Sequence, residues 1–151
     1  MGPHDAARRH RKGTLVKTLV LRQPWASLVA EGRKTIELRT WTTAHRGPML
    51  VVAGKGVDRS DSIRLGRGTD PAGVTLCIVD VVDVRPATNL DADAAGCAPD
   101  VGREFAWVLA NPRVVRRIEV KGRLGLYEIS AEMLGLPPGT SRASGMIALL
   151  A

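Results

Sequence analysis

Five side chains in the first third of the chain have types that could do chemistry at close spacing. Lys34, Glu37 and His45 carry an amine, a carboxylate and an imidazole, which are the groups that transfer protons in general acid–base catalysis. Arg39 can bind a phosphate or a base edge through its planar fork of donors, and Trp41 can stack on an unpaired base. The stretch therefore suits either acid–base catalysis or nucleic-acid binding.

A short helix is predicted just before these residues. Pro24 favours a helix start because its φ angle is already set and its missing donor would have no helical partner. Trp25, Leu28 and Val29 then follow at the i, i+3 and i+4 spacing of one apolar helix face. On this pattern Ser27 lies on the side toward solvent, and Trp25 is either a core residue or a stacking surface.

A strand is predicted over residues 35–41, where polar and apolar residues alternate. Ile36 and Leu38 fall on the apolar face, so Glu37, Arg39 and Trp41 project together on the other face. Lys34 stands at the corner between helix and strand, and its flexible stem can reach over the same face. The alternation thus predicts one polar surface that gathers the reactive side chains.

Positive charge is concentrated in the same part of the chain. The net charge is +7, and residues 1–46 carry ten Lys or Arg against three Asp or Glu, whereas residues 47–151 are balanced. Such an asymmetry favours an anionic partner, since neutralising phosphates releases condensed counterions. The alternative is that the excess only reflects an arginine-rich composition.

The motifs around these residues resemble those of the ASCH domain family, which is related to the PUA fold. Gly32, Lys34, Glu37 and Arg39 match the family signature G-x-K-x-x-E-x-R. Further blocks are similar to the branch found in activating signal cointegrator proteins: Gln23-Pro24-Trp25-Ala26-Ser27, Trp41, His45-Arg46-Gly47, Trp107-Val108-Leu109, Asn111-Pro112-Arg113, Val120-Lys121-Gly122 and Gly125-Leu126-Tyr127. The resemblance extends over roughly residues 15–129 and implies a PUA-like barrel with a helix near its mouth.

The rest of the sequence agrees with a single small domain of this kind. Short strand patterns separated by turns, with two or three short helices, predict an α+β fold with a small β-barrel of about five to seven mostly antiparallel strands. We expect Asn111-Pro112 to be a turn between two of these strands. Residues 1–13 read as a disordered basic arm that carries four Lys or Arg, and residues 14–151 as the domain.

Two catalytic hypotheses remain open. Some small ASCH proteins act as amidohydrolases on N4-acetylcytidine-type nucleosides, with a threonine nucleophile three positions after the signature lysine. That position is Glu37 here, so the nucleophilic mechanism does not carry over, although Glu37 could activate water as a general base. Ribonuclease activity has also been suggested for the family, and would use His45 with Lys34 or Glu37.

Nucleic-acid binding requires fewer assumptions than either reaction. Arg39 would contact phosphate or a base edge, Glu37 would orient Arg39, and Trp41 would stack. The predicted binding set is Arg22, Gln23, Trp25, Ser27, Lys34, Glu37, Arg39, Trp41, His45, Arg46 and Lys121. The partner is RNA or DNA. A protein-interaction module in transcription regulation is a further alternative, because the similar branch occurs in coactivators.

No cofactor and no metal site are expected. Asp80 and Asp83 fall on opposite faces of a strongly apolar strand, which argues against a shared metal ion. Cys77 and Cys97 give no disulfide framework, and no apolar run approaches the roughly 20 residues of a membrane span. We therefore expect a cytoplasmic monomer with no membrane partner.

Overall fold

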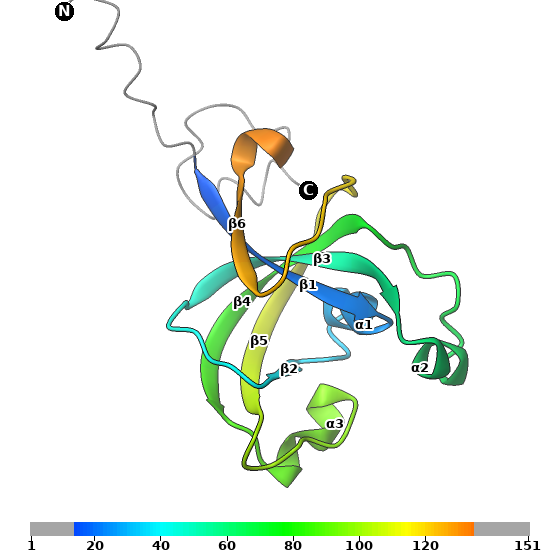
Figure 1. Cartoon of the computed structure of the whole chain (residues 1–151), viewed down its shortest axis with the longest axis vertical. Coiled ribbons are helices and arrows are strands. Elements are labelled where there is room, and N and C mark those ends of the chain that lie inside the picture. Colours follow the sequence, from blue (N-terminus) through cyan, green and yellow to red (C-terminus); the bar gives the residue numbers. More distant parts are fainter. Residues whose placement is uncertain (1–13, 135–151) are drawn as a thin grey trace, which may run out of the picture.

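The computed structural model describes residues 14–134, which form one curled six-stranded sheet with short helices at its ends (Figure 1). The strands are β1 (Leu15–Gln23), β2 (Ile36–Arg39), β3 (Gly47–Val57), β4 (Val74–Pro86), β5 (Phe105–Val114) and β6 (Leu126–Ser130). The helices are α1 (Trp25–Ala30), α2 (Arg59–Arg64), α3 (Ala92–Ala95) and the 3₁₀ turns η2 (Asn89–Asp91) and η3 (Ala131–Leu134).

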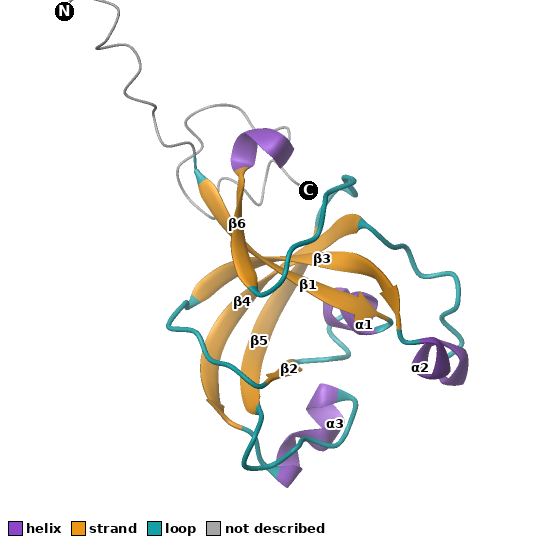
Figure 2. Ribbon diagram, viewed as in Figure 1, coloured by secondary structure: helices purple, strands orange, loops and turns teal. Residues whose placement is uncertain are grey.

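The strand order is β2-β5-β4-β3-β1-β6, and only the β1–β3 pair is parallel within residues 14–134. This confirms the predicted α+β class with mostly antiparallel strands. Figure 2 shows the strands crossing over one another, so the sheet is barrel-like although β2 and β6 do not pair to close it.

The central strands form because their apolar runs are covered on both faces. In β3, residues 49–53 are all at most 1% exposed, as expected for an uninterrupted apolar run between two neighbouring strands. One face of the sheet packs on α1 through a cluster that includes Leu19, Val51 and Trp107, which we call the helix-side core. The other face holds a second cluster that includes Val16, Leu50 and Ile78, which we call the opposite core.

A side-chain hydrogen bond links the two separated strands β1 and β2. Nη2 of Arg39, the last residue of β2, donates to the backbone oxygen of Val20 in β1 at 3.0 Å. The two strands lie at positions one and five of the sheet order, so no backbone ladder joins them. Arg39 therefore stabilises the curled shape as well as belonging to the signature.

The predicted turn at Asn111-Pro112 is wrong. Strand β5 continues through these residues to Val114, and the pairing with β4 shifts register between Ile78 and Asp80. Asn111 has a φ of 56°, so the Asn-Pro pair is accommodated as an irregularity within the strand, as in a β-bulge. Proline is tolerated at such a position because the local ladder hydrogen bond is already lost.

The segment after β5 is not the further strand that its Val and Ile residues suggest. Residues 115–120 make a single isolated bridge, between Val74 and Glu119, and are held further by backbone hydrogen bonds from Val115 and Val120 and by the buried Thr75. The Thr75 hydroxyl donates to the backbone oxygen of Arg116 at 2.8 Å and accepts from the amide of Ile118 at 2.9 Å. This anchors the segment along the start of β4.

Helix α2 follows β3, and the stretch after β4 contains η2 and α3. Asp91 organises this second region. Its carboxylate accepts two hydrogen bonds of 2.8 Å from the guanidinium of Arg85 and one of 2.9 Å from the amide of Thr88. These bonds lower the pKa of Asp91 from 3.8 to about 2.

The predicted basic arm over residues 1–13 and the end of the predicted domain, residues 135–151, lie outside the described residues. In the part of the chain that the structure describes, no helix is long and apolar enough to cross a membrane.

We predict that Asp91→Asn lowers the free energy of unfolding by about 2 kcal/mol at pH 6, because it weakens charged hydrogen bonds to a buried group. A depressed carboxyl pKa stabilises the fold above pH 3.8, and this contribution is lost as the pH falls toward about 2. The difference between wild type and variant should therefore shrink over that range. Urea unfolding at several pH values tests this, with the exposed α3 residue Asp93→Asn as control.

Candidate functional site

Lys34 is the centre of the signature and is buried, with only 4% of its surface exposed. Its Nζ donates to the backbone oxygen of Ile36 at 2.6 Å and to that of Ala95 at 2.5 Å. Burial lowers the pKa of Lys34 from its usual 10.5, because desolvation disfavours the ammonium, while the nearby carboxylate of Glu37 acts in the other direction. The predicted reach over an exposed face is wrong: the amine points into the protein.

Helix α3 supplies the surroundings of this amine. The amide of Thr35 donates to the backbone oxygen of Ala94 at 2.9 Å, next to the Ala95 oxygen that accepts from Lys34. The helix ends at Gly96 with a φ of 78°, and a Cβ atom there would lie 2.9 Å from the ring of Trp25. Glycine is therefore required at this position for both its backbone conformation and its close packing.

Glu37 is also more buried than strand alternation predicted. Only 9% of the residue is exposed, one carboxylate oxygen accepts from the amide of Leu38 at 3.0 Å, and the other lies 4.0 Å from Nη2 of Arg39. The prediction that Glu37 projects from an open polar face together with Arg39 and Trp41 is thus wrong for Glu37, which is buried. Arg39 keeps 27% of its side chain exposed while it bonds to Val20, so part of the guanidinium faces solvent.

The two candidate stacking residues are both half-buried. Trp41 packs edge-on against Trp107, with ring centroids 4.8 Å apart and an interplanar angle of 81°, and the Trp107 indole donates to the backbone oxygen of Trp41 at 3.2 Å. Trp25 packs on the helix-side core, and Nζ of Lys34 lies 5.3 Å from its ring centroid. Each ring is thus fixed in orientation by the core, which is the state that a stacking surface needs.

Gln23 and Ser27 do not lie at a solvent rim. Gln23 is 1% exposed, and its amide group donates to the Ser27 hydroxyl at 2.8 Å and to the backbone oxygen of Pro71 at 2.7 Å. Its side-chain oxygen accepts from the amide of Ser27 at 3.0 Å. The expectation that Ser27 faces solvent was wrong because this pair fastens the start of α1 to the loop before β4.

His45 and Arg46 lie just before β3. The ring Nε2 of His45 lies 2.9 Å from the backbone oxygen of Pro48, so the imidazole is engaged locally. Arg46 is exposed, bonds to the backbone oxygen of Thr43 at 3.0 Å and lies 3.7 Å from a carboxylate oxygen of Asp83. This exposed arginine remains available at the surface of the chain.

The structure separates Arg22 and Lys121 from the signature. Both line a pocket of about 820 Å³ whose wall includes Val20 and Val52, and these valines belong to the opposite core. The tryptophans of the signature pack instead on the helix-side core. Sequence reasoning missed Lys55, a third cation of this pocket, although its place between two glycines at the end of an apolar run was a signal of a functional loop.

A metal centre has no support within residues 14–134, where no group of three or more metal-ligating side chains is found. Asp80 pairs with Arg113 at 3.0 Å and Asp83 with Arg46. Each carboxylate thus has its own arginine. Cys77 is buried, and burial raises the pKa of its thiol to about 12, so it is an inert core residue.

Comparison with known proteins identifies the family to which the chain belongs. Residues 19–119, two thirds of the chain, match the ASCH domain. The chain belongs to the ASCH family. Activating signal cointegrator 1 from Mus musculus is 28% identical over 130 residues, which cover 76% of the chain and 22% of that protein. The human protein of the same name is 26% identical over the same shares. The ASCH chain thus spans about a fifth of the length of these relatives.

Solved structures show the same fold at low sequence identity. The ASCH protein from Zymomonas mobilis superposes with a TM-score of 0.53 at 12% identity and covers 88% of this chain and 92% of its own. A serine-to-alanine variant of that protein gives a TM-score of 0.54 at 13% identity, with 79% and 91% covered. Both are crystal structures, and the likeness confirms the PUA-like architecture predicted for this chain.

We predict that Lys34→Met lowers the free energy of unfolding by about 2 kcal/mol at pH 7, because two buried backbone oxygens lose their donor. The lowered pKa means that the folded state holds its proton less tightly than the unfolded state, so wild type should gain stability relative to the variant as the pH rises toward 10.5. Chemical unfolding at pH 7 and pH 10 measures this, with the exposed Lys55→Met as control. A difference that does not change with pH would contradict the assignment.

Proposed function

We propose that this ASCH domain binds nucleic acid, RNA or DNA, through the signature surface formed by Arg39 and Trp41 with Arg46 at its edge. The observation that carries the proposal is the fixed position of the Arg39 guanidinium. One of its nitrogens bonds to Val20, Glu37 lies beside it, and about a quarter of the side chain remains open to solvent. A guanidinium held in this way can direct its free donors at a phosphate or base edge with little further loss of entropy.

The roles of the signature residues change from those expected from sequence. Lys34 and Glu37 are buried, so we propose that they position β2 and Arg39 and do not contact the nucleic acid directly. Trp107 contacts Trp41 edge-on and fixes its orientation, and the partly exposed ring of Trp41 is the surface on which a base would stack. Stacking on such a ring is worth about 1–3 kcal/mol per base and tolerates any sequence.

Charge supports an anionic partner of this kind. Ten of the 22 Lys and Arg residues fall within residues 1–46, where only three acids occur. Phosphate contacts made by this part of the chain would give binding that weakens steeply with salt. A protein partner held by apolar contacts, which the name of the cointegrator relatives suggests as an alternative, would be much less sensitive to salt.

A hydrolytic activity on RNA or on N4-acetylcytidine is the second candidate, and one observation favours it. The lowered pKa of Lys34 and its nearness to Glu37 are typical of acid–base pairs. Incubation of N4-acetylcytidine and of single-stranded RNA with wild type and with Lys34→Met tests the idea. Turnover that is lost in the variant, while the variant stays folded, supports catalysis; absence of turnover by wild type excludes it.

We predict that Arg39→Gln weakens binding of the full chain to labelled nucleic acid by about tenfold, because one charged fork contact is lost. Fluorescence anisotropy with single-stranded RNA, single-stranded DNA and duplex DNA at two salt concentrations measures the change. A thermal unfolding curve checks that the variant folds without the bond to Val20.

Two controls separate the domain surface from general charge. Arg59→Gln removes one exposed positive charge on α2, which carries none of the signature residues, and should change affinity less than twofold. Replacement of Arg8, Arg9, Arg11 and Lys12 by serine in the full chain tests the basic N-terminal residues. If this last variant alone abolishes binding and Arg39→Gln does not alter it, the proposed surface is wrong.

A further inference from the structure

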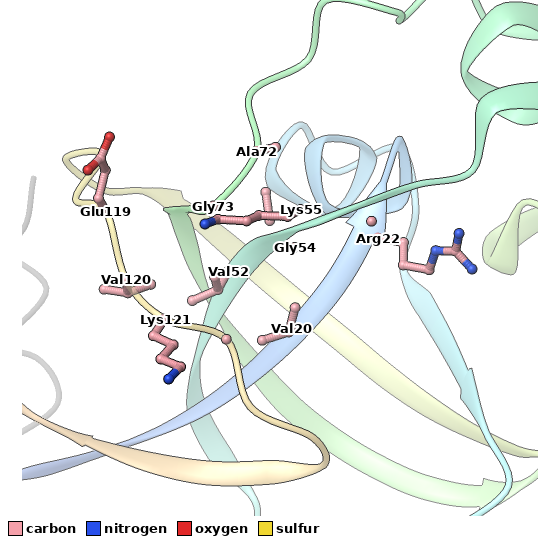
Figure 3. Close-up of a pocket in the computed structure, with 13 residues that line it drawn as sticks. Val20, Arg22, Val52, Gly54, Lys55, Ala72, Gly73, Glu119, Val120 and Lys121 are labelled. Atoms are coloured by element: carbon pink, nitrogen blue, oxygen red, sulfur yellow. The ribbon is translucent and has the colours of Figure 1, made fainter.

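The pocket on the opposite face of the sheet has the features of a second binding site. It has a volume of about 820 Å³, within the range of small-molecule pockets, and lies between the ends of β1 and β3 and residues 119–122. Figure 3 shows Arg22, Lys55 and Lys121 spaced around it, with Val20 and Val52 between them. The wall thus combines cationic groups with an apolar surface.

The cations of this pocket have little to neutralise them. Lys55 and Lys121 are exposed, and neither makes a salt bridge with another residue of the described range 14–134. Arg22 is oriented by a hydrogen bond of 3.3 Å from Nη2 to the backbone oxygen of Val57. Glu119 is the one acid among the lining residues. Arg22 also has the carboxylate of Asp58 nearby, so Lys55 and Lys121 carry the positive charge that favours an anionic ligand.

Glycines in the pocket wall allow close packing around Val20. A Cβ atom on Gly54 would lie 2.9 Å from a methyl carbon of Val20, and one on Gly122 would lie 3.3 Å from the other. Both glycines line the pocket, as do Gly56 and Gly73. Gly54 and Gly122 therefore let the backbone on two sides of the pocket pack closely against Val20, which forms part of its wall.

The wall formed by residues 119–122 is fixed before any ligand arrives. The amide of Val120 donates to the backbone oxygen of Gly73 at 3.2 Å, and the amide of Gly73 donates to that of Ala53 at 2.7 Å. Thr75 anchors the residues just before this wall. Lys121 and Lys55 are thus carried by two segments that are hydrogen-bonded into one frame, which reduces the entropy cost of binding.

We propose that this pocket binds a nucleoside monophosphate unit, either as a free nucleotide or as the 5′-phosphorylated end of a strand. The phosphate binds between the flexible side chains of Lys55 and Lys121, while Arg22 lies at the other end of the pocket. The base packs on Val20 and Val120, which line the pocket and are partly exposed. Glu119 accepts a hydrogen bond from a sugar hydroxyl or base amino group. The site is separate from the signature surface and stands independently of the function proposed for that surface.

The test uses adenosine monophosphate and adenosine as probes, with isothermal calorimetry on the full chain. The pocket variant is Lys55→Gln with Lys121→Gln. The matched control is Arg116→Gln with Arg117→Gln, which removes the same charge from two exposed residues near the pocket wall that do not line it. Each variant is first checked for an unchanged thermal unfolding midpoint.

We expect wild type to bind adenosine monophosphate at least about tenfold more tightly than adenosine, and the pocket variant to lose that preference. The matched control should change affinity less than twofold. The proposal would be overturned if the pocket variant and the matched control lost equal affinity for adenosine monophosphate. It would also be overturned if wild type bound adenosine monophosphate no more tightly than adenosine. Comparison of 5′-phosphorylated and 5′-hydroxyl RNA hexamers then distinguishes a strand end from a free nucleotide as the source of the phosphate.

Discussion

The arrangement of the signature depends on one buried charge. The ammonium of Lys34 lies inside the protein, where an unpaired charge would cost several kcal/mol, and it is satisfied by the backbone oxygens of Ile36 and Ala95. These oxygens belong to the start of β2 and the end of α3, which are distant in sequence. The lysine therefore joins the two elements, and Glu37 and Arg39 take their positions from the strand that it holds.

The curled sheet depends in turn on Arg39. Its hydrogen bond to the backbone oxygen of Val20 links β2 to β1, two strands that are not neighbours in the sheet and share no backbone ladder. Val20 also lines the pocket on the other face of the sheet, so a single residue of β1 separates the two candidate sites. The signature thus serves the fold and the surface together: the buried members fix the geometry, and the partly exposed guanidinium faces the solvent.

Much of this fold could be predicted from sequence because its strands carry strong local patterns. The continuous apolar run of β3 and the long run of β4 were placed correctly, and the signature motifs led to the correct family. The burial of Lys34 and Ser27 could not be predicted, since it depends on α3 and on the loop around Pro71, both far away in the chain. Alternation of polar and apolar residues shows which side chains share a face of a strand, but it does not show which other elements of the fold cover that face.

The same limit explains the remaining differences. Asn111-Pro112 has a strong turn composition, and only the pairing of β5 with β4 shows that it is accommodated within a strand. Lys121 and Arg22 were both expected near the signature, yet tertiary packing places them with Lys55 on the opposite face. Local sequence identified the residues with functional chemistry, and long-range contacts decided how they are grouped.

The most direct test of the central claim is an NMR titration of the ¹⁵N-labelled full chain with a short single-stranded RNA at moderate salt, followed by the same titration with DNA. The account predicts that backbone and indole signals of residues 39–46 shift progressively with at least one of the two ligands, while those of α2 stay in place. Shifts confined to residues 1–13, or no shifts with either ligand, would contradict nucleic-acid binding at the signature surface.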